Sequence, residues 1–344
     1  MGTKRKRSEA TERLIAEKLG SGNSLRSDDN PWKAVGNQVV EEIRDDFSAI
    51  TEADQIGGSL NTLGDIKLAT EDGSTVYVET KFVKNGGGTL ANLWGDALTD
   101  LGQFNDAMSW SEFRRNTNHS GWVNSHLDRF SYPSTFDFPE GNKTNRYKKA
   151  GHLKDVIGWT KGQETDEAAD EIKKSQDSTE DQLLAADIIL NITTLEEEEK
   201  LNYLRYLNQK EQNSEIIKRL SILLILGIHT KEKIMGYADT AISELQVEAE
   251  NYIMYVGRRN DGSVVKWNPE DFIDSLLDKE FSCRFDEDNT SIKIVTSWNG
   301  EQKPLLRASL HWGNKFQGIE TPSIRVFRDD ILKQLESEES KIPY

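Results

Sequence analysis

Two short strand patterns joined by a tight turn constrain this chain more than any other feature of its sequence. Residues 64–70 and 75–82 are rich in β-branched and aromatic side chains, and Glu71-Asp72-Gly73 separates them, which predicts a β-hairpin. The last residue of such a three-residue loop has a positive φ, which suits Gly73. The loop therefore places Thr70 opposite Ser74.

This register sorts the side chains of the hairpin onto two faces. The apolar face holds Ile66, Leu68, Val76 and Val78. The opposite face holds Asp65, Lys67, Tyr77, Glu79 and Lys81. A two-residue Asp72-Gly73 turn would set Ile66 opposite Glu79 and mix apolar with charged positions, so the pattern disfavours it.

Asp65 and Glu79 face each other across this ladder. Two carboxylates with Cβ atoms ~5 Å apart repel each other unless a cation lies between them. Mg²⁺ suits the position, because one or two carboxylates, waters and phosphate oxygens are its usual ligands. Lys81 lies on the same face, where it can stabilise charge on a phosphate or orient an attacking water. The alternative is a solvated strand face with incidental charges.

The pattern resembles the PD-(D/E)XK phosphodiesterase superfamily of restriction-endonuclease-like proteins. Gly64-Asp65 is followed by thirteen residues and then by Glu79-Thr80-Lys81, and the resemblance covers about residues 31–105. It implies that Asp65 and Glu79 bind a metal ion and that Lys81 is the active-site lysine. Gly64 stands in place of the proline that gives the motif its first letter.

A helix is predicted before the hairpin. Asn30 suits its N-cap and Pro31 its first position. Apolar or small residues recur along one side of it, at Trp32, Val35, Gly36, Val39, Ile43 and Phe47. Many members of the superfamily carry a supporting glutamate on this helix. Glu42 lies at the edge of the apolar side and is favoured over Glu41, which points nearly away from it; for either, an ordinary solvated charge is the alternative.

The remaining elements follow from local patterns. Gly86-Gly87-Gly88 is interpreted as a flexible connection into a helix from Leu90 to about Ala107, with Thr89 as its cap. Further helices are predicted at residues 182–191, 195–209, 213–226 and 231–250. Glu196 to Glu199 would form the solvated first turn of the second of these helices. The short apolar run from Tyr252 to Val256 is the best candidate for a further inner strand of the core.

Charge is distributed unevenly along the chain. It has 344 residues with 43 Lys+Arg and 59 Asp+Glu, a net charge of −16, which by itself argues against a polyanionic partner. Residues 162–251 hold 20 acids and nine bases, whereas residues 110–161 hold nine bases and five acids among nine aromatic residues. Cations interleaved with aromatic side chains suit nucleic-acid binding, although surface loops with aromatic residues in the core are the alternative.

The candidate contacts to nucleic acid come from two basic segments. From the first, they are Arg114, Arg115, Arg129, Lys143, Arg146, Lys148 and Lys149. The second segment, residues 298–327, is predicted as two strands around a turn. Its Arg307, Lys315 and Arg325 could enter a groove, and an ordinary β-hairpin is the alternative.

Other features limit where the protein works. Cys283 is the only cysteine, so an internal disulfide and a cysteine-based zinc site are excluded, and a reducing compartment fits. The apolar run at residues 220–228 is far shorter than the ~20 residues that cross a bilayer. For Lys4-Arg5-Lys6-Arg7 a solubilising tail is favoured over a nuclear address or a phosphate-contacting arm. No secretory signal and no membrane partner are expected, and the expected location is the cytoplasm.

Together these features predict an α/β protein with a restriction-endonuclease-like mixed sheet flanked by helices, a large mainly helical insertion and a C-terminal β-rich segment. The expected division is a basic arm (1–30), the first part of the core (31–107), the insertion (108–237), the remainder of the core (238–280) and the β-rich segment (281–344).

The resemblance implies a Mg²⁺-dependent endodeoxyribonuclease that acts on double-stranded DNA, of the type II restriction or phage-defence kind. Mn²⁺ is expected to substitute for Mg²⁺. A homodimer is expected, because cutting both strands takes two sites. A repair, recombination or RNA-directed nuclease and a non-catalytic nucleic-acid-binding protein remain alternatives.

Overall fold

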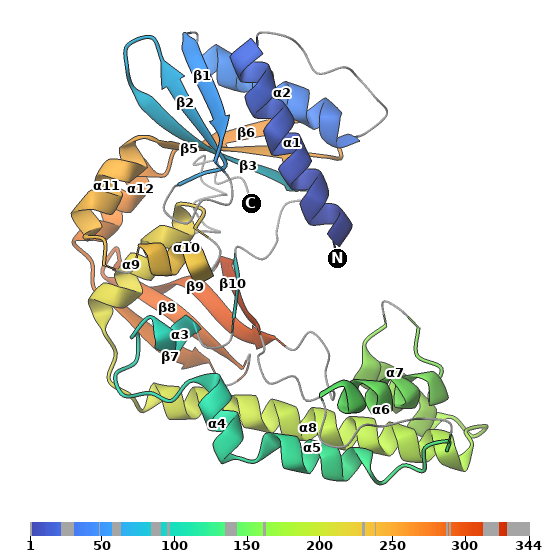
Figure 1. The fold of residues 1–344 in the computed structure, drawn as a ribbon. Coiled ribbons are helices and arrows are strands. Elements are labelled where there is room, and N and C mark those ends of the chain that lie inside the picture. Colours follow the sequence, from blue (N-terminus) through green and yellow to red (C-terminus); the bar gives the residue numbers. More distant parts are fainter. Residues whose placement is uncertain are drawn as a thin grey trace.

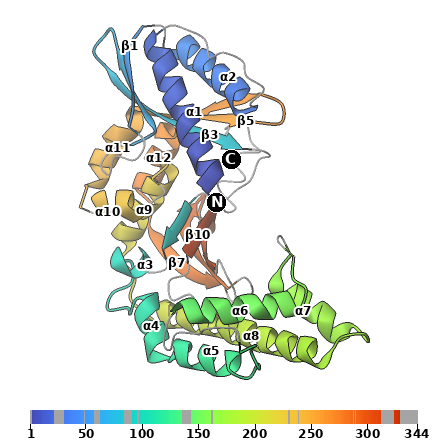
Figure 2. The ribbon, with the colours of Figure 1, turned by 45° about the vertical axis from the view of Figure 1, so that its right-hand side comes forward.

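The computed structural model describes most of the chain. The described residues are 2–21, 31–47, 49–56, 63–83, 91–94, 97–134, 143–160, 163–228, 231–237, 239–286, 288, 290–311 and 323–328. They form an α/β structure with two five-stranded sheets, one mixed (sheet A) and one antiparallel (sheet B). Both views show a crescent, with sheet A at one end, a layer of helices at the other and sheet B between them (Figures 1 and 2). Within these residues, no helix is long and apolar enough to span a membrane.

Sheet A contains the predicted hairpin. In spatial order its strands are β1 (Ile50–Gln55), β2 (Ile66–Thr70), β3 (Thr75–Val83), β5 (Tyr252–Arg258) and β6 (Val264–Trp267). β5 pairs in parallel with β3, and the other neighbours are antiparallel. The strand predicted at residues 252–256 is therefore confirmed, and it lies directly beside the strand that carries Glu79.

The register of the hairpin is also confirmed. Ile66 pairs with Val78, and the N–H of Thr70 donates to the carbonyl of Ser74 at 3.1 Å. Gly73 has a φ of +83°, the conformation that the predicted turn requires.

Two helices, α1 (Gly2–Ser21) and α2 (Pro31–Asp46), cover one face of sheet A (Figure 1). α2 is the predicted helix, with Val39 and Ile43 fully buried against the apolar face of the hairpin. α1 lies in the segment predicted as a basic arm. Its Ile15 and Leu19 belong to the same core, so the second half of α1 is a packed helix; the side chains of Lys4 to Arg7, predicted as a solubilising tail, lie outside the described residues.

Four helices cover the other face of sheet A and separate it from sheet B. They are α9 (Ser214–Ile225), α10 (Lys231–Gly236), α11 (Ile242–Glu250) and α12 (Glu270–Leu277). One hydrophobic core joins these helices to Met254 of sheet A and to Leu306 of sheet B. α9 was predicted. The single helix predicted at 231–250 is instead two, and the break follows Gly236, a poor helix former.

Sheet B contains the strands of the predicted β-rich segment. Its spatial order is β4 (Ala91–Trp94), β10 (Ser323–Arg328), β9 (Glu301–His311), β8 (Ser291–Trp298) and β7 (Phe281–Asp286). The helix predicted from Leu90 to Ala107 is wrong: β4 pairs with β10, and only the short α3 (Ala97–Asp100) follows. Pairing with a strand more than two hundred residues away overrides the local pattern.

The remaining helices form the far end of the crescent (Figure 2). They are α4 (Trp110–Asn116), α5 (His119–Leu127), α6 (Lys143–Val156), α7 (Thr165–Lys174) and α8 (Glu180–Asn208). α8 is continuous where two helices were predicted, because burial of Ile192 and Thr193 outweighs the low helix propensity of β-branched residues. Glu196 and Glu199 therefore lie in mid-helix, and with 1% and 6% exposure they are not a solvated first turn.

Candidate active site

The first residue of the candidate site, Asp65, is held where the chain enters β2, an interior strand of sheet A. Its N–H donates to the carbonyl of Val78 at 2.8 Å, and its carboxylate accepts the backbone N–H of Thr80 at 3.0 Å. β3 extends past the residue that pairs with the start of β2, so the backbone N–H of Thr80 has no partner within β2. Asp65 supplies the missing acceptor, and its carboxylate is thereby fixed beside β3.

Gly64 explains how the chain enters this position without the proline of the motif. Its φ is +67°, and a Cβ atom there would lie 2.8 Å from the carbonyl oxygen of Val78. Proline is confined to a φ near −65°, so it cannot adopt this backbone. The close approach of the chain to β3 requires glycine.

The second carboxylate, Glu79, lies one ladder position beyond the pair of Ile66 and Val78. It is 3% exposed, and its carboxylate forms an ion pair with the ammonium group of Lys81. The side chain of Lys81 is 27% exposed, so the pair connects a buried anion with the surface. Burying Glu79 without a cation would be costly, and Lys81 offsets part of that cost.

Glu79 is enclosed from the side of the helices by Gly227, at the end of α9. A Cβ atom at Gly227 would lie 3.1 Å from the Glu79 carboxyl carbon and 2.5 Å from the hydroxyl of Tyr252. Gly227 also has a φ of +79°. Only glycine allows this turn to pass so close to the buried carboxylate.

Two further charged residues of the site were missed in the sequence. Lys233 of α10 is partly buried, and this burial lowers its pKa, while the carboxylates of Asp65 and Glu12 act to raise that pKa. Glu12 of α1 is 7% exposed. It precedes Ile15 and Leu19 by three and seven residues, so helical periodicity could have placed it on the buried face. No motif marks Lys233.

The structure does not bring Glu42 or Glu41 to this site. α2 packs over β5 and β6 on the face of sheet A that holds Val78, whereas Glu79 alternates to the other face. Glu42 accepts a hydrogen bond from Gln38 at 3.3 Å, and Glu41 pairs with Arg44 at 3.3 Å. Both therefore fit the alternative of ordinary helix charges.

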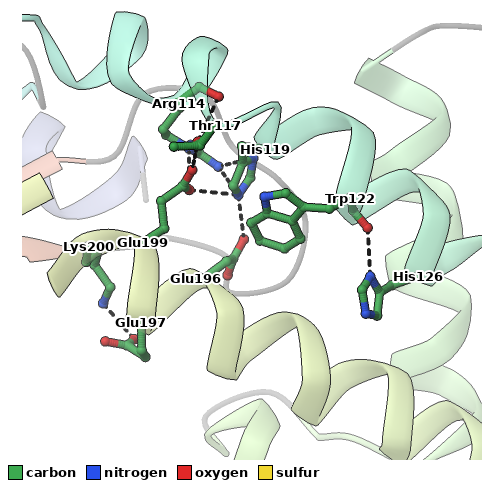
Figure 3. A network of polar contacts seen from close by, with 9 residues as sticks. All are labelled: Arg114, Thr117, His119, Trp122, His126, Glu196, Glu197, Glu199 and Lys200. Carbon is green, nitrogen blue, oxygen red and sulfur yellow. Dashed lines mark hydrogen bonds and ion pairs between the residues drawn. The ribbon is translucent and has the colours of Figure 1, made fainter. Parts of the chain in front are cut away.

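Arg114 and Arg146, two of the predicted nucleic-acid contacts, are buried. Arg114 is 3% exposed, and its Nε lies 3.3 Å from Oε2 of Glu199. Arg146 is 9% exposed. His119 lies 3.6 Å from both Glu196 and Glu199, and Figure 3 shows these side chains converging from α4, α5 and α8. Arg114 is therefore part of an internal network, which corrects its assignment as a phosphate contact.

The other predicted contacts differ in their availability. Arg129 pairs with Asp187 at 2.9 Å, and Lys149 pairs with Asp128. Arg115 and Lys148 are exposed. The side chain of Lys143 and the whole of Lys315 lie outside the described residues. The basic segment thus presents fewer unpaired cations than its composition suggested.

The donor set of the candidate site suits a hard divalent cation. Asp65 and Glu79 offer carboxylate oxygens, the ligands that Mg²⁺ prefers. In the described part of the chain, no group of three or more His, Cys, Asp or Glu side chains is arranged to hold a metal ion. A two-carboxylate site leaves positions for water and phosphate, as is usual for Mg²⁺.

Searches against family models, curated proteins and solved structures found no match to this chain. The fold and the charged residues of the candidate site are thus the only guides to its function.

Proposed function

We propose that this protein is a Mg²⁺-dependent endodeoxyribonuclease that hydrolyses phosphodiester bonds in double-stranded DNA, in a restriction or phage-defence role. One observation carries the proposal: Asp65, anchored on the N–H of Thr80, stands opposite the buried Glu79 in the register that pairs Ile66 with Val78, and Glu79 is paired with Lys81. Two fixed carboxylates and a lysine at the ends of paired strands suit phosphodiester hydrolysis better than a structural role.

The charges of the site support a requirement for a cation. Asp65 and Glu79 contribute two carboxylates, and Lys81 contributes one ammonium group. The balance is one negative charge, before any phosphate enters. A phosphate diester would add another, so binding of the substrate favours a divalent cation.

Each residue then has a defined task. Asp65 and Glu79 would hold Mg²⁺, which when bound supplies positive charge to the phosphate and makes water more acidic. The partly exposed Lys81 can donate hydrogen bonds to a phosphate oxygen and position the attacking water. Thr80 keeps the Asp65 carboxylate oriented through its backbone N–H.

Asp65→Asn is the sharpest test of this proposal. The amide oxygen of asparagine still accepts the N–H of Thr80, so the fold is preserved while the negative charge is lost. We expect Mg²⁺-dependent cleavage of plasmid and long linear DNA to fall by about 10³-fold or more. Sequencing of the fragment ends would show whether the wild-type protein cuts at one motif, as a restriction enzyme does.

Glu42→Gln is the matched control, because it removes a carboxylate from the helix on the opposite face of sheet A. It should cut at the wild-type rate. Mg²⁺-dependent cleavage retained by Asp65→Asn would contradict the proposal. Salt-sensitive DNA binding by the wild-type protein without turnover in Mg²⁺ or Mn²⁺ would instead identify a non-catalytic binding protein.

A further inference from the structure

The two faces of sheet B have opposite character. One face belongs to the core: Cys283, Ile294, Leu306 and Val326 are each at most 6% exposed. Because side chains alternate along a strand, the residues between these positions lie on the outer face, except at the bulge that follows Ile294, where Val295 and Leu305 are buried as well. We define the outer face of sheet B by Arg284, Lys293, Arg307, Arg325 and Phe327.

The strand register lines up cations across this outer face. Arg284 of β7 is paired with Lys293 of β8, and Lys293 is paired with Arg307 of β9. Arg307 is in turn paired with Phe327 of β10. Arg325 lies two residues before Phe327 and on the same face. Three basic side chains thus follow one another on three adjacent strands, and a fourth lies in the next row.

Like charges directly opposite each other destabilise a sheet unless an anion lies near them. Asp286 provides one such anion and pairs with Lys293 at 2.9 Å. Arg307 lies over the ring of Phe327 at 4.9 Å, which leaves its charge uncompensated. Arg284 and Arg325 form no ion pair with any residue that the structure describes. Three arginines therefore remain without an acidic partner there, in a chain whose net charge is −16.

The spacing of these cations suits a nucleic-acid backbone. Neighbouring strands lie ~4.8 Å apart, so the row from Arg284 to Arg307 extends over roughly 10 Å of sheet. Double-stranded DNA carries one phosphate charge per ~1.7 Å of its axis. Each guanidinium group can donate two parallel hydrogen bonds to a phosphate. Figures 1 and 2 show the strands of sheet B running between sheet A and the helices α4–α8.

We propose that the outer face of sheet B binds the phosphate backbone of double-stranded DNA through Arg284, Arg307 and Arg325. The choice of DNA among polyanions rests on the proposed nuclease function. This face, rather than the segment at residues 110–161, then supplies the main electrostatic contact. In that segment Arg114 and Arg129 are already paired with acids of the protein.

The test compares two charge-matched triple variants. In the first, Arg284, Arg307 and Arg325 are replaced by glutamine; in the second, Lys173, Lys174 and Lys210 of the helical region are replaced by glutamine. Binding of a fluorescent duplex of about 30 base pairs is measured in EDTA, between about 0.05 and 0.3 M NaCl. No cleavage takes place under these conditions, so binding is scored independently of catalysis.

We expect the arginine variant to bind about 100-fold more weakly at about 0.15 M salt, with the slope of log K against log salt reduced by about 2.7, or 0.9 for each lost phosphate contact. The lysine variant should bind like the wild type. Replacing the same three arginines with lysine should restore most of the binding, which separates loss of charge from misfolding.

Wild-type affinity and salt slope in the arginine variant would overturn the inference, as would an equal loss in the lysine variant. The proposed nuclease function fails separately. If the wild-type protein binds DNA through these arginines but never cuts in Mg²⁺, the inference holds and the nuclease proposal is wrong. If it cuts DNA while the arginine variant binds normally, the reverse is true.

Discussion

Two regions of this molecule bury carboxylates beside cations, and they differ in how completely the charges are matched. At the candidate site on sheet A, Glu79 is paired with a lysine that reaches the surface, and Asp65 is held by a backbone N–H. In the helical region, Glu199 is buried with Arg114, and Thr117 also donates to it. The first region keeps a net negative charge, whereas in the second region the buried carboxylate is compensated by arginine.

The difference separates a site that can accept a ligand from one that holds helices together. In the network of Figure 3, Glu199 is paired with Arg114, and His119 lies between Glu196 and Glu199. These side chains come from α4, α5 and α8, so their contacts join three helices of this region. Carboxylates and cations like those at sheet A thus hold helices together when they neutralise each other away from solvent.

Glu199→Ala should lower the stability of the protein more than the other substitutions described below. It leaves the buried Arg114 without its carboxylate, and removing one partner of a buried pair costs about 3–5 kcal/mol. We expect the free energy of unfolding in urea to fall by that amount. The variant should keep its Mg²⁺-dependent cleavage at low temperature, because the network holds helices and does not bind the substrate.

If Glu199→Ala were as stable as the wild type and lost only activity, the conclusion that the helical network is structural would be wrong. Glu198→Ala is the control, since Glu198 precedes Glu199 on the same helix and its side chain is exposed. Its removal should cost no more than about 0.5 kcal/mol.

Local patterns predicted the hairpin of the candidate site well and the internal network not at all. The register around Gly73 and the inner strand at residues 252–256 follow from turn chemistry and from alternation over a few residues. The partners Arg114 and Glu199 lie 85 positions apart, and neither belongs to a recognisable motif. In the sequence, four consecutive glutamates are typical of a solvated surface, and nothing local indicates that a cation from another helix contacts them.

The sequence-based predictions that were wrong for helices and strands also failed because they could not include distant contacts. Residues 91–94 were assigned to a helix, and they form a strand because β10 pairs with them. Glu42 was favoured as the supporting acid from its position on one helix, whereas Glu12, on a helix that was not predicted, interacts electrostatically with Lys233. Tertiary contacts decided both outcomes, and a single sequence does not display them.

Gly227→Ala tests how closely the candidate site is packed. An added Cβ would meet the Tyr252 hydroxyl and the Glu79 carboxyl carbon, at a φ of +79°. We expect the free energy of unfolding to fall by about 2 kcal/mol or more, the sum of backbone strain and overpacking. Cleavage of DNA should fall as well, because Glu79 is displaced.

Gly262→Ala is the matched control for backbone strain. Its φ is +74°, and a Cβ there would meet no atom within 4 Å, so it should lose only about 1 kcal/mol and no activity. Equal losses in the two variants would show that contact with Glu79 is unimportant, and that the site is more loosely packed than the structure implies.

The smallest expected effect concerns the protonation of the internal network. Burial, together with the positive charges of Arg114 and Arg146, lowers the pKa of His119 from its ordinary value of 6.5 to about 2. The unfolded chain therefore binds a proton at this histidine below about pH 6.5, while the folded protein does not. By linkage, the free energy of unfolding should fall as pH decreases below that value, by at most about 1.4 kcal/mol per pH unit from this group.

Urea unfolding between about pH 7 and pH 5 should show this slope in the wild type and a shallower one in His119→Gln. His126→Gln, which changes a histidine that contacts the Trp122 carbonyl and neither Glu196 nor Glu199, should keep the wild-type slope. A wild-type slope that persists in His119→Gln would mean that groups other than His119 control the acid sensitivity.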